Sequence, residues 1–173
     1  MNRYSDALEH LYAVARSRYR TVRIHVCSDH GMAPTKNIID VRSRLARLKA
    51  RAPDDYLCLL DSTMARFWFF SDKARSEVME IFSERDRGEW LSEYSLRRLH
   101  AFFDDHRYGE EIYLMPEGTV IAPSHMGVRA PRGMHGFHPL SQHSFTAFLS
   151  SEDYGDGVRH ISDVFSVMSA YAN

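Results

Sequence analysis

Long apolar segments and an excess of one charge are both absent from this chain of 173 residues. Its longest apolar runs, such as 67–70, are far too short to span a bilayer, and the N-terminus lacks the apolar core of a signal peptide. With 22 basic and 23 acidic residues, the net charge of −1 creates no overall field that would attract nucleic acid or an anionic membrane. These absences predict a cytoplasmic protein without a membrane or a nucleic acid polymer as its partner. Any anionic substrate must be held locally.

Cysteine is scarce as well, since only Cys27 and Cys58 occur. Each lies in an apolar, strand-like run, where a free thiol usually behaves as a small core residue. We therefore expect two free thiols rather than a disulfide. Hydrophobic residues nevertheless make up 44% of the chain, which is enough for a core at this length, so we expect one unit over 1–173.

The periodicity of apolar residues predicts a mixture of helices and short strands. Helical spacing favours helices, which we expect over 4–18, 38–50, 72–83, 92–100 and 158–170. Alternating or continuous apolar runs favour strands, which we expect over 22–27, 56–60, 65–70, 110–115 and 119–122. Asp40 is the expected N-cap of the second helix, and the turn composition of 116–118 predicts a hairpin between the last two strands.

The first motif with chemical character is Ser-Asp-His-Gly-Met at 28–32, directly after the expected strand 22–27. A carboxylate and an imidazole at one fixed point form a ligand pair suited to zinc or a similar divalent ion. Taken alone, Asp29 could equally cap a turn and His30 could be an ordinary loop residue, because only the geometry of a cluster makes a site.

A second motif, Gly-Met-His-Gly-Phe at 133–137, lies in a stretch from 123 to 143 that is rich in glycine, proline and histidine. Loops of that length are usually functional or disordered. The glycines on both sides of the Met134-His135 dipeptide allow an imidazole to approach a metal with little steric hindrance. Taken alone, this segment could also be an exposed loop that happens to contain a histidine.

Together, and in this order, the two motifs resemble those of the type I phosphodiesterase and nucleotide pyrophosphatase branch of the alkaline phosphatase superfamily. The segments 61–68, 108–110 and 123–127 also resemble stretches of that family, so the resemblance covers nearly the whole chain. It implies an α/β fold in which a partial alkaline-phosphatase-like sheet is flanked by helices. The chain would be the C-terminal part of the family's catalytic domain.

The resemblance also implies a chemistry. Asp29 and His30 would bind one divalent metal ion and His135 would bind its neighbour. Two such ions, zinc or alternatively manganese, can clamp a phosphoryl group between them. The implied substrate is a small phosphoester or nucleotide.

The chain departs from the family pattern in two places. His138 stands where the family usually has an acidic residue, which changes the groups that orient the site. The family's nucleophilic threonine or serine, an aspartate and a further Asp/His ligand pair lie upstream of the first motif, and residues 1–27 do not resemble them. We therefore expect part of a metal-dependent hydrolase that is weak or inactive as an isolated chain. The alternative is a truncated, non-catalytic metal-binding or interaction module.

Three smaller expectations concern the surface. An incomplete sheet would expose a strand edge, which favours a homo-oligomer or a partner chain that covers it. The basic run within 42–51 has helical spacing and indicates a solvated face rather than a phosphate patch. His125, His138 and His143 lie near the second motif and could replace missing ligands.

Overall fold

The computed structural model describes residues 2–82 and 86–170 and confirms the α/β class. The chain divides into two compact units, which we call the terminal unit (1–29 with 146–173) and the central unit (30–145). The expectation of one unit over 1–173 stays a prediction. No helix in the described part of the chain is long and apolar enough to cross a membrane.

The described residues of the terminal unit form two α-helices and one pair of strands. They are α1 (Asn2–Arg18), α5 (Ile161–Ser169), β1 (His25–Cys27) and β10 (Phe148–Ser150), with a short 3-10 helix η3 (Gly155–Gly157) before α5. β1 and β10 run antiparallel, with Val26 opposite Leu149. The predicted helix 4–18 is thereby confirmed, and the helix predicted over 158–170 is confirmed from Ile161 onward. The predicted strand 22–27 is reduced to its last three residues.

The central unit is built on a four-stranded antiparallel sheet. Its order is β4 (Tyr56–Leu60), β5 (Met64–Phe69), β7 (Glu111–Leu114) and β6 (Glu89–Trp90). Phe67 of β5 is completely buried, and four aromatic rings surround it with centroids 5.8 to 6.3 Å away, those of Tyr56, Phe69, Phe82 and Trp90. This aromatic cluster is the centre of the main hydrophobic core.

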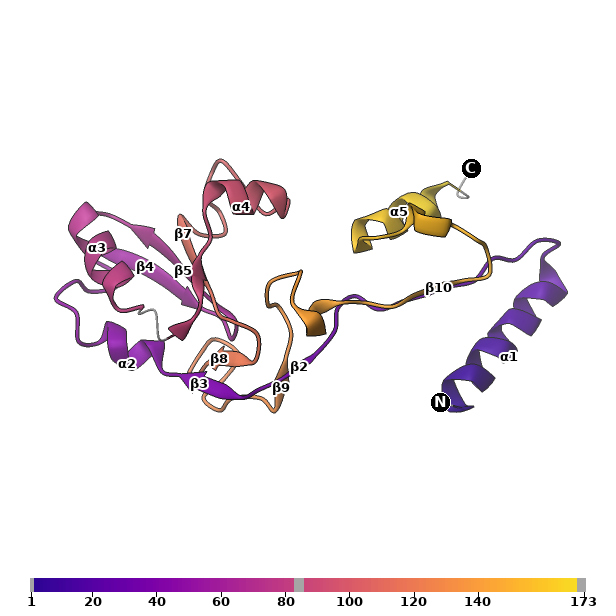
Figure 1. Ribbon diagram of the computed structural model, residues 1–173, viewed down its shortest axis with the longest axis horizontal. Helices are drawn as coiled ribbons and strands as arrows, with labels where there is room; N and C mark the ends of the chain where they lie inside the picture. The colour runs from indigo at the N-terminus through magenta and orange to yellow at the C-terminus, as the bar shows by residue number, and fades with distance from the viewer. Residues whose placement is uncertain (1, 83–85, 171–173) are drawn as a thin grey trace. The chain divides into compact units, whose positions relative to one another are not determined.

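The described residues of the same unit also form three short α-helices, α2 (Val41–Leu45), α3 (Asp72–Glu80) and α4 (Glu93–Arg98), and a 3-10 helix, η2 (Gln142–Ser144). Each of the three α-helices begins where a side-chain oxygen accepts a backbone hydrogen bond from the first turn, and the capping residues are Asp40, Ser71 and Ser92. α3 packs against β5 (Figure 1). Its residues Ala74 and Val78 are buried. The cap at Asp40 is as predicted, but the helix expected over 38–50 ends at Leu45.

The hairpin predicted around 116–118 is wrong. β7 pairs with β5 and β6, whereas β8 (Thr119–Ile121) pairs in parallel with β3 (Asn37–Ile39). The carbonyl of Gly118 accepts hydrogen bonds from the backbone N–H groups of Lys36 and Asn37 and so joins the turn to the start of β3. The composition of a turn indicates that the chain reverses, but it does not determine which strands pair afterwards.

The solvated basic face predicted over 42–51 is wrong for Arg44. Its guanidinium is half-buried and lies 2.6 and 2.8 Å from the two carboxylate oxygens of Asp86, and it also donates to the carbonyl of Ile81. The hydrogen bond to Asp86 raises the pKa of Arg44. This ion pair ties the helix α2 to the residues that follow α3.

Both cysteines are free thiols, as predicted. Cys58 is partly buried against the main core, and burial raises the pKa of its thiol. Cys27 is exposed, so the expectation that it behaves as a core residue is wrong. The strand β1 that carries Cys27 has only three residues, and none of them is buried.

The last strand pair of the central unit joins the two sequence motifs. β2 (Ala33–Pro34) follows the first motif, β9 (Gly133–Met134) lies within the second, and the two strands pair antiparallel (Figure 1). Ala33, Val120 and Phe137 form a small second core beneath them. This core holds two segments side by side that are far apart in the sequence.

Candidate functional site

His30 and His135 lie together at the end of the β2–β9 pair. Their imidazole rings stack with centroids 3.7 Å apart and planes inclined by 14°. His30 is half-buried and His135 is exposed, so the pair is accessible from solvent. The structure therefore brings together two of the three residues that the sequence singled out, one from each motif.

The protonation of His30 follows from its contact with the backbone. Its Nδ1 lies 2.9 Å from the carbonyl oxygen of Gly31. Because a carbonyl oxygen only accepts hydrogen bonds, Nδ1 carries the proton in the neutral ring and Nε2 carries the lone pair. In this tautomer, Nε2 is the nitrogen whose lone pair has the chemistry of a metal ligand.

Close packing at Gly31 fixes the position of the backbone beside His30. A Cβ atom built at Gly31 would lie 2.0 Å from the carbonyl oxygen of His143 and 2.9 Å from that of Phe145. No side chain fits in that space, so glycine is required by the close approach of the two backbone segments. The segment 143–145 therefore lies directly on the residue that follows His30.

Glu117 holds this segment in place. Its carboxylate accepts a hydrogen bond from the backbone N–H of His143 at 3.0 Å and lies 2.6 Å from Nδ1 of the same residue. These two hydrogen bonds, the backbone one first, lower the pKa of Glu117. Sequence reasoning missed Glu117 because the segment 116–118 was interpreted only as a turn.

His135 is fixed by the residues that follow it. Gly136 has a φ of 85°, which is a left-handed conformation that other residues rarely adopt. Phe137 is 6% exposed and belongs to the second core with Ala33 and Val120. A buried anchor and a left-handed turn thus hold an exposed histidine.

The described residues do not form a complete metal site. Asp29 is exposed and is the last residue of the terminal unit, so its convergence with His30 and His135 stays a prediction. Within 2–82 and 86–170, no group of three or more His, Cys, Asp or Glu side chains is arranged to hold a metal ion. Imidazole nitrogen suits zinc, but two imidazoles are one ligand short of the usual three. The type of donor fits zinc, and the number of donors does not.

Two of the three histidines considered as replacement ligands use a ring nitrogen in another hydrogen bond. Nδ1 of His138 accepts from the backbone N–H of Leu140 at 3.2 Å, and Nδ1 of His143 bonds to Glu117. His125 is exposed, and its backbone N–H donates to the carbonyl of Leu60. Among the described residues, these three histidines do not form a metal-binding group with His30 and His135.

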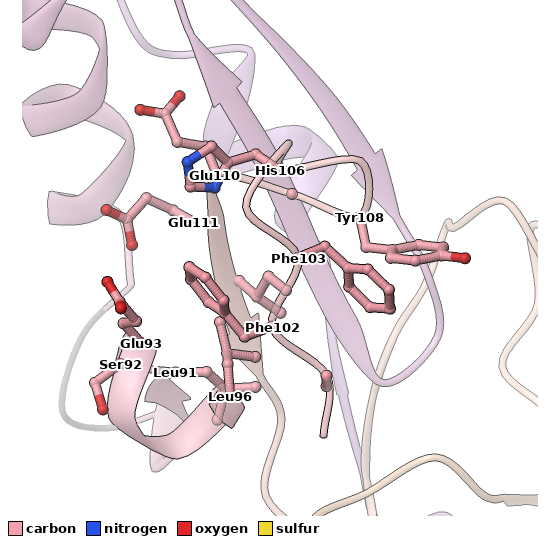
Figure 2. A pocket seen from close by; sticks show the side chains of 13 residues that line it. Leu91, Ser92, Glu93, Leu96, Phe102, Phe103, His106, Tyr108, Glu110 and Glu111 are labelled. Carbon is pink, nitrogen blue, oxygen red and sulfur yellow. The ribbon is translucent and has the colours of Figure 1, made fainter. Parts of the chain in front are cut away.

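A separate hollow of about 280 Å³ lies between α4, the segment 101–109 and β7. Figure 2 shows the carboxylates of Glu93 and Glu111 on one side of it and aromatic side chains of the 101–109 segment on the other. Glu93 pairs with Arg97 at 2.8 Å and Glu111 with Arg75 at 2.7 Å. None of the three predicted metal ligands lines this hollow, and its carboxylates have cationic partners within the protein.

No protein family model matches this chain, and neither does any curated protein. Solved structures do resemble it. The murine ectonucleotide pyrophosphatase/phosphodiesterase 5 structure matches with a TM-score of 0.58 and 19% identity, over 75% of this chain and 34% of that chain. An inactive variant of the murine protein in complex with AMP matches with a TM-score of 0.57 and 20% identity, over 75% and 33%. The human protein matches with a TM-score of 0.58 and 19% identity, over 75% and 33%.

This chain spans about a third of the length of these structures. At a sequence identity of 19 to 20%, these matches show similarity of fold alone. Over 75% of its length, this chain therefore has the fold of a part of the ectonucleotide pyrophosphatase/phosphodiesterase 5 structures. This agrees with the expected α/β fold with a partial alkaline-phosphatase-like sheet.

Proposed function

We propose that this chain is the C-terminal part of a metal-dependent phosphoester hydrolase of the phosphodiesterase and nucleotide pyrophosphatase type. The observation that carries the proposal is the stacked pair of His30 and His135, because it unites the two motifs on which the resemblance depends. The shared fold supports it, and one of the similar structures contains AMP, which is a phosphoester.

In this proposal, Asp29 and His30 are ligands of one divalent ion, zinc or manganese, and His135 is a ligand of a second. Residues outside 1–173 supply the remaining ligands and the nucleophile. A pair of such ions orients a phosphoryl group and neutralises its charge when bound. The substrate is a small phosphoester or a nucleotide.

The second candidate is a truncated, non-catalytic module that binds metal or a partner chain. Two observations favour it: the described residues contain no complete metal site, and the chain spans about a third of the similar structures. Both candidates use His30 and His135. They differ in whether a longer chain turns over a phosphoester.

Turnover of bis-nitrophenyl phosphate with excess zinc or manganese separates the two candidates. The assay compares this chain with a longer chain that adds the genomic sequence directly before Met1, each with and without His30→Ala. We expect little or no turnover by the short chain, and metal-dependent turnover by the long chain that His30→Ala abolishes. His125→Ala replaces an exposed histidine outside the pair and serves as the matched control.

Two results would contradict the proposal. A long chain without metal-dependent turnover, or with turnover that survives His30→Ala, would favour the non-catalytic module. Equal turnover by the short and the long chain would mean that residues 1–173 contain the nucleophile and all ligands, against the assignment of these groups to other residues.

A further inference from the structure

We propose that β1 pairs with β1 of a second copy of this chain, in an antiparallel, two-fold symmetric contact centred on Val26. The contact joins two two-stranded sheets into one four-stranded sheet with the order β10–β1–β1–β10. All residues that form it belong to the terminal unit. It requires neither a metal ion nor a phosphoester, so it does not rest on the proposed hydrolase function.

The β1–β10 pair is too small to be stable by itself. Each strand has three residues, and none of these residues is buried. An isolated pair of strands is at best marginally stable in water, whereas three or more strands with an apolar face can be stable. A further strand beside the pair would therefore stabilise the sheet.

Two backbone hydrogen bonds determine which groups of β1 point toward β10. The N–H of Ser28 donates to the carbonyl of Ala147, and the N–H of Ser151 donates to the carbonyl of Ile24. Hydrogen-bonded rungs alternate with non-hydrogen-bonded ones along an antiparallel pair, so the rung of Val26 between them is hydrogen-bonded as well. The backbone groups at positions 24, 26 and 28 are therefore directed toward β10.

The intervening residues, His25 and Cys27, direct their N–H and C=O groups away from β10, to what we call the outer edge of β1. Among the residues that the structure describes, β10 is the only strand that pairs with β1. Cys27 is exposed and His25 is half-buried, so solvent reaches this edge. An open strand edge is a template for pairing with another chain.

The outer edges of two copies fit each other in one register. A contact centred on Val26 sets His25 opposite Cys27 of the second copy, and the reverse, so both outward residues of each strand form hydrogen bonds across the contact. A contact centred on His25 or on Cys27 would set one outward residue opposite a residue outside the three-residue strand. The two-fold contact uses the same surface on both copies, as dimers usually do.

The charges on either side of β1 suit this register and a second copy. Arg23 lies three residues before Val26, and Asp29 lies three residues after it. The two-fold axis therefore sets the arginine of each copy opposite the aspartate of the other. Opposite charges across a strand pair are favourable and like charges are unfavourable. Arg23 also lies 3.4 Å from Glu152 of its own chain, which holds it beside the sheet.

The contact also widens an apolar face. Val26 lies directly opposite Leu149, so the two side chains share one face of the sheet. Leu149 is 66% exposed, and Val26 is half-buried. In the dimer, Val26 of one copy lies opposite Val26 of the other, and the apolar row continues through Leu149 on both outer strands.

A disulfide across the two-fold axis tests the register. Val26 meets itself in a non-hydrogen-bonded rung, where the Cα atoms lie about 4.5 Å apart, within the range of about 4.4–6.8 Å that a disulfide spans. The full chain with Cys27→Ser and Cys58→Ala receives Val26→Cys and is oxidised with diamide at low protein concentration. We expect most of it to become a disulfide-linked dimer. Leu149→Cys in the same background is the matched control, and it should form little, because this position lies on the neighbouring strand.

Exchanging the two charges tests the complementarity. In sedimentation equilibrium, Arg23→Asp and Asp29→Arg should each weaken dimerisation by about tenfold, since each sets like charges opposite one another at two symmetric rungs. The double variant should return to the affinity of the parent, which a merely structural role of either residue would not produce. Glu152→Gln removes the partner of Arg23 within the chain and should leave dimerisation unchanged. EDTA in the buffer excludes any effect of a metal ion at Asp29.

Three results would overturn the proposal. A parent chain that stays monomeric would mean that another occupant, such as further residues of a longer chain, covers the outer edge of β1. Crosslinking of Leu149→Cys as complete as that of Val26→Cys would exclude the register. A double charge variant that dimerises no better than the single variants would exclude the ion pairs between copies. None of these measurements changes if the chain proves to lack any hydrolase activity.

Discussion

Replacing Gly31 by alanine should disrupt the histidine pair while most of the central unit stays folded. The added Cβ would lie 2.0 Å from the carbonyl oxygen of His143, where real contacts essentially never fall below 3.0 Å. The obstacle is backbone and cannot rotate away as the end of a side chain could. Either residue 31 or the segment 143–145 must therefore move by about 1 Å.

The magnitude follows from what resists that movement. Glu117 holds His143 through both its backbone N–H and its ring. Overpacking in a well-packed region costs about 1–3 kcal/mol, and we expect the upper end because the segment is anchored. Displacement of residue 31 also shifts His30, so the stacking of His30 on His135 should be lost.

Urea denaturation and the NMR signals of the two imidazole rings test this expectation. The midpoint of unfolding should fall with an unchanged dependence on urea, and the ring signals of His30 and His135 should shift. Gly157→Ala is the control, because a Cβ there meets no atom within 4 Å. A Gly31→Ala protein within about 0.5 kcal/mol of the parent, which is ordinary for a surface substitution, and with unchanged ring signals would refute the close packing.

Arg44→Met should lower the free energy of unfolding by about 1.5–3 kcal/mol, because the carboxylate of Asp86, which is 8% exposed, loses a charged hydrogen-bond partner. Urea denaturation measures this loss, and Arg42→Met, at an exposed arginine, is the control. Lowering the pH should loosen the loop that Glu117 holds. The pKa of Glu117 is depressed in the folded state, so its stabilisation is complete above the ordinary value of 4.5 and is lost as the pH falls through the lower folded value. Hydrogen exchange at the His143 amide checks this, and Glu117→Gln should remove the pH dependence. The chain should also self-associate, because β1 and β10 form only a two-stranded sheet in the described residues, and a strictly monomeric particle in sedimentation would contradict it.

Local patterns predicted the strands well where the strand is buried. The apolar run 56–60 coincides with β4, and 65–70 differs from β5 by a single residue at each end. Which strands pair with one another could not be predicted from these local patterns, because strand pairing depends on contacts between distant segments. β3 was expected as the start of a helix, because its isoleucines also fit helical spacing, and only its parallel pairing with β8 makes it a strand.

The candidate site likewise contains residues that the sequence predicted and residues that it did not. His30 and His135 were found in the sequence because each lies in a short motif, and the two motifs occur in a recognisable order. Glu117 was not assigned a role, because it acts through hydrogen bonds to a residue 26 positions further along the chain, which only the folded chain brings close.

The two histidines depend on local backbone geometry more than on the main core. Gly31 fixes His30 through a close backbone approach, and Gly136 fixes His135 through a left-handed turn next to the buried Phe137. The main core around Phe67 is formed by other residues, and none of its members contributes to the small core beneath the pair. Substitutions at Gly31 or Gly136 should therefore remove metal binding at little cost to the main sheet. Substitutions at Phe67 should lower the stability of the whole unit, and metal binding should fall only in proportion to the fraction that unfolds.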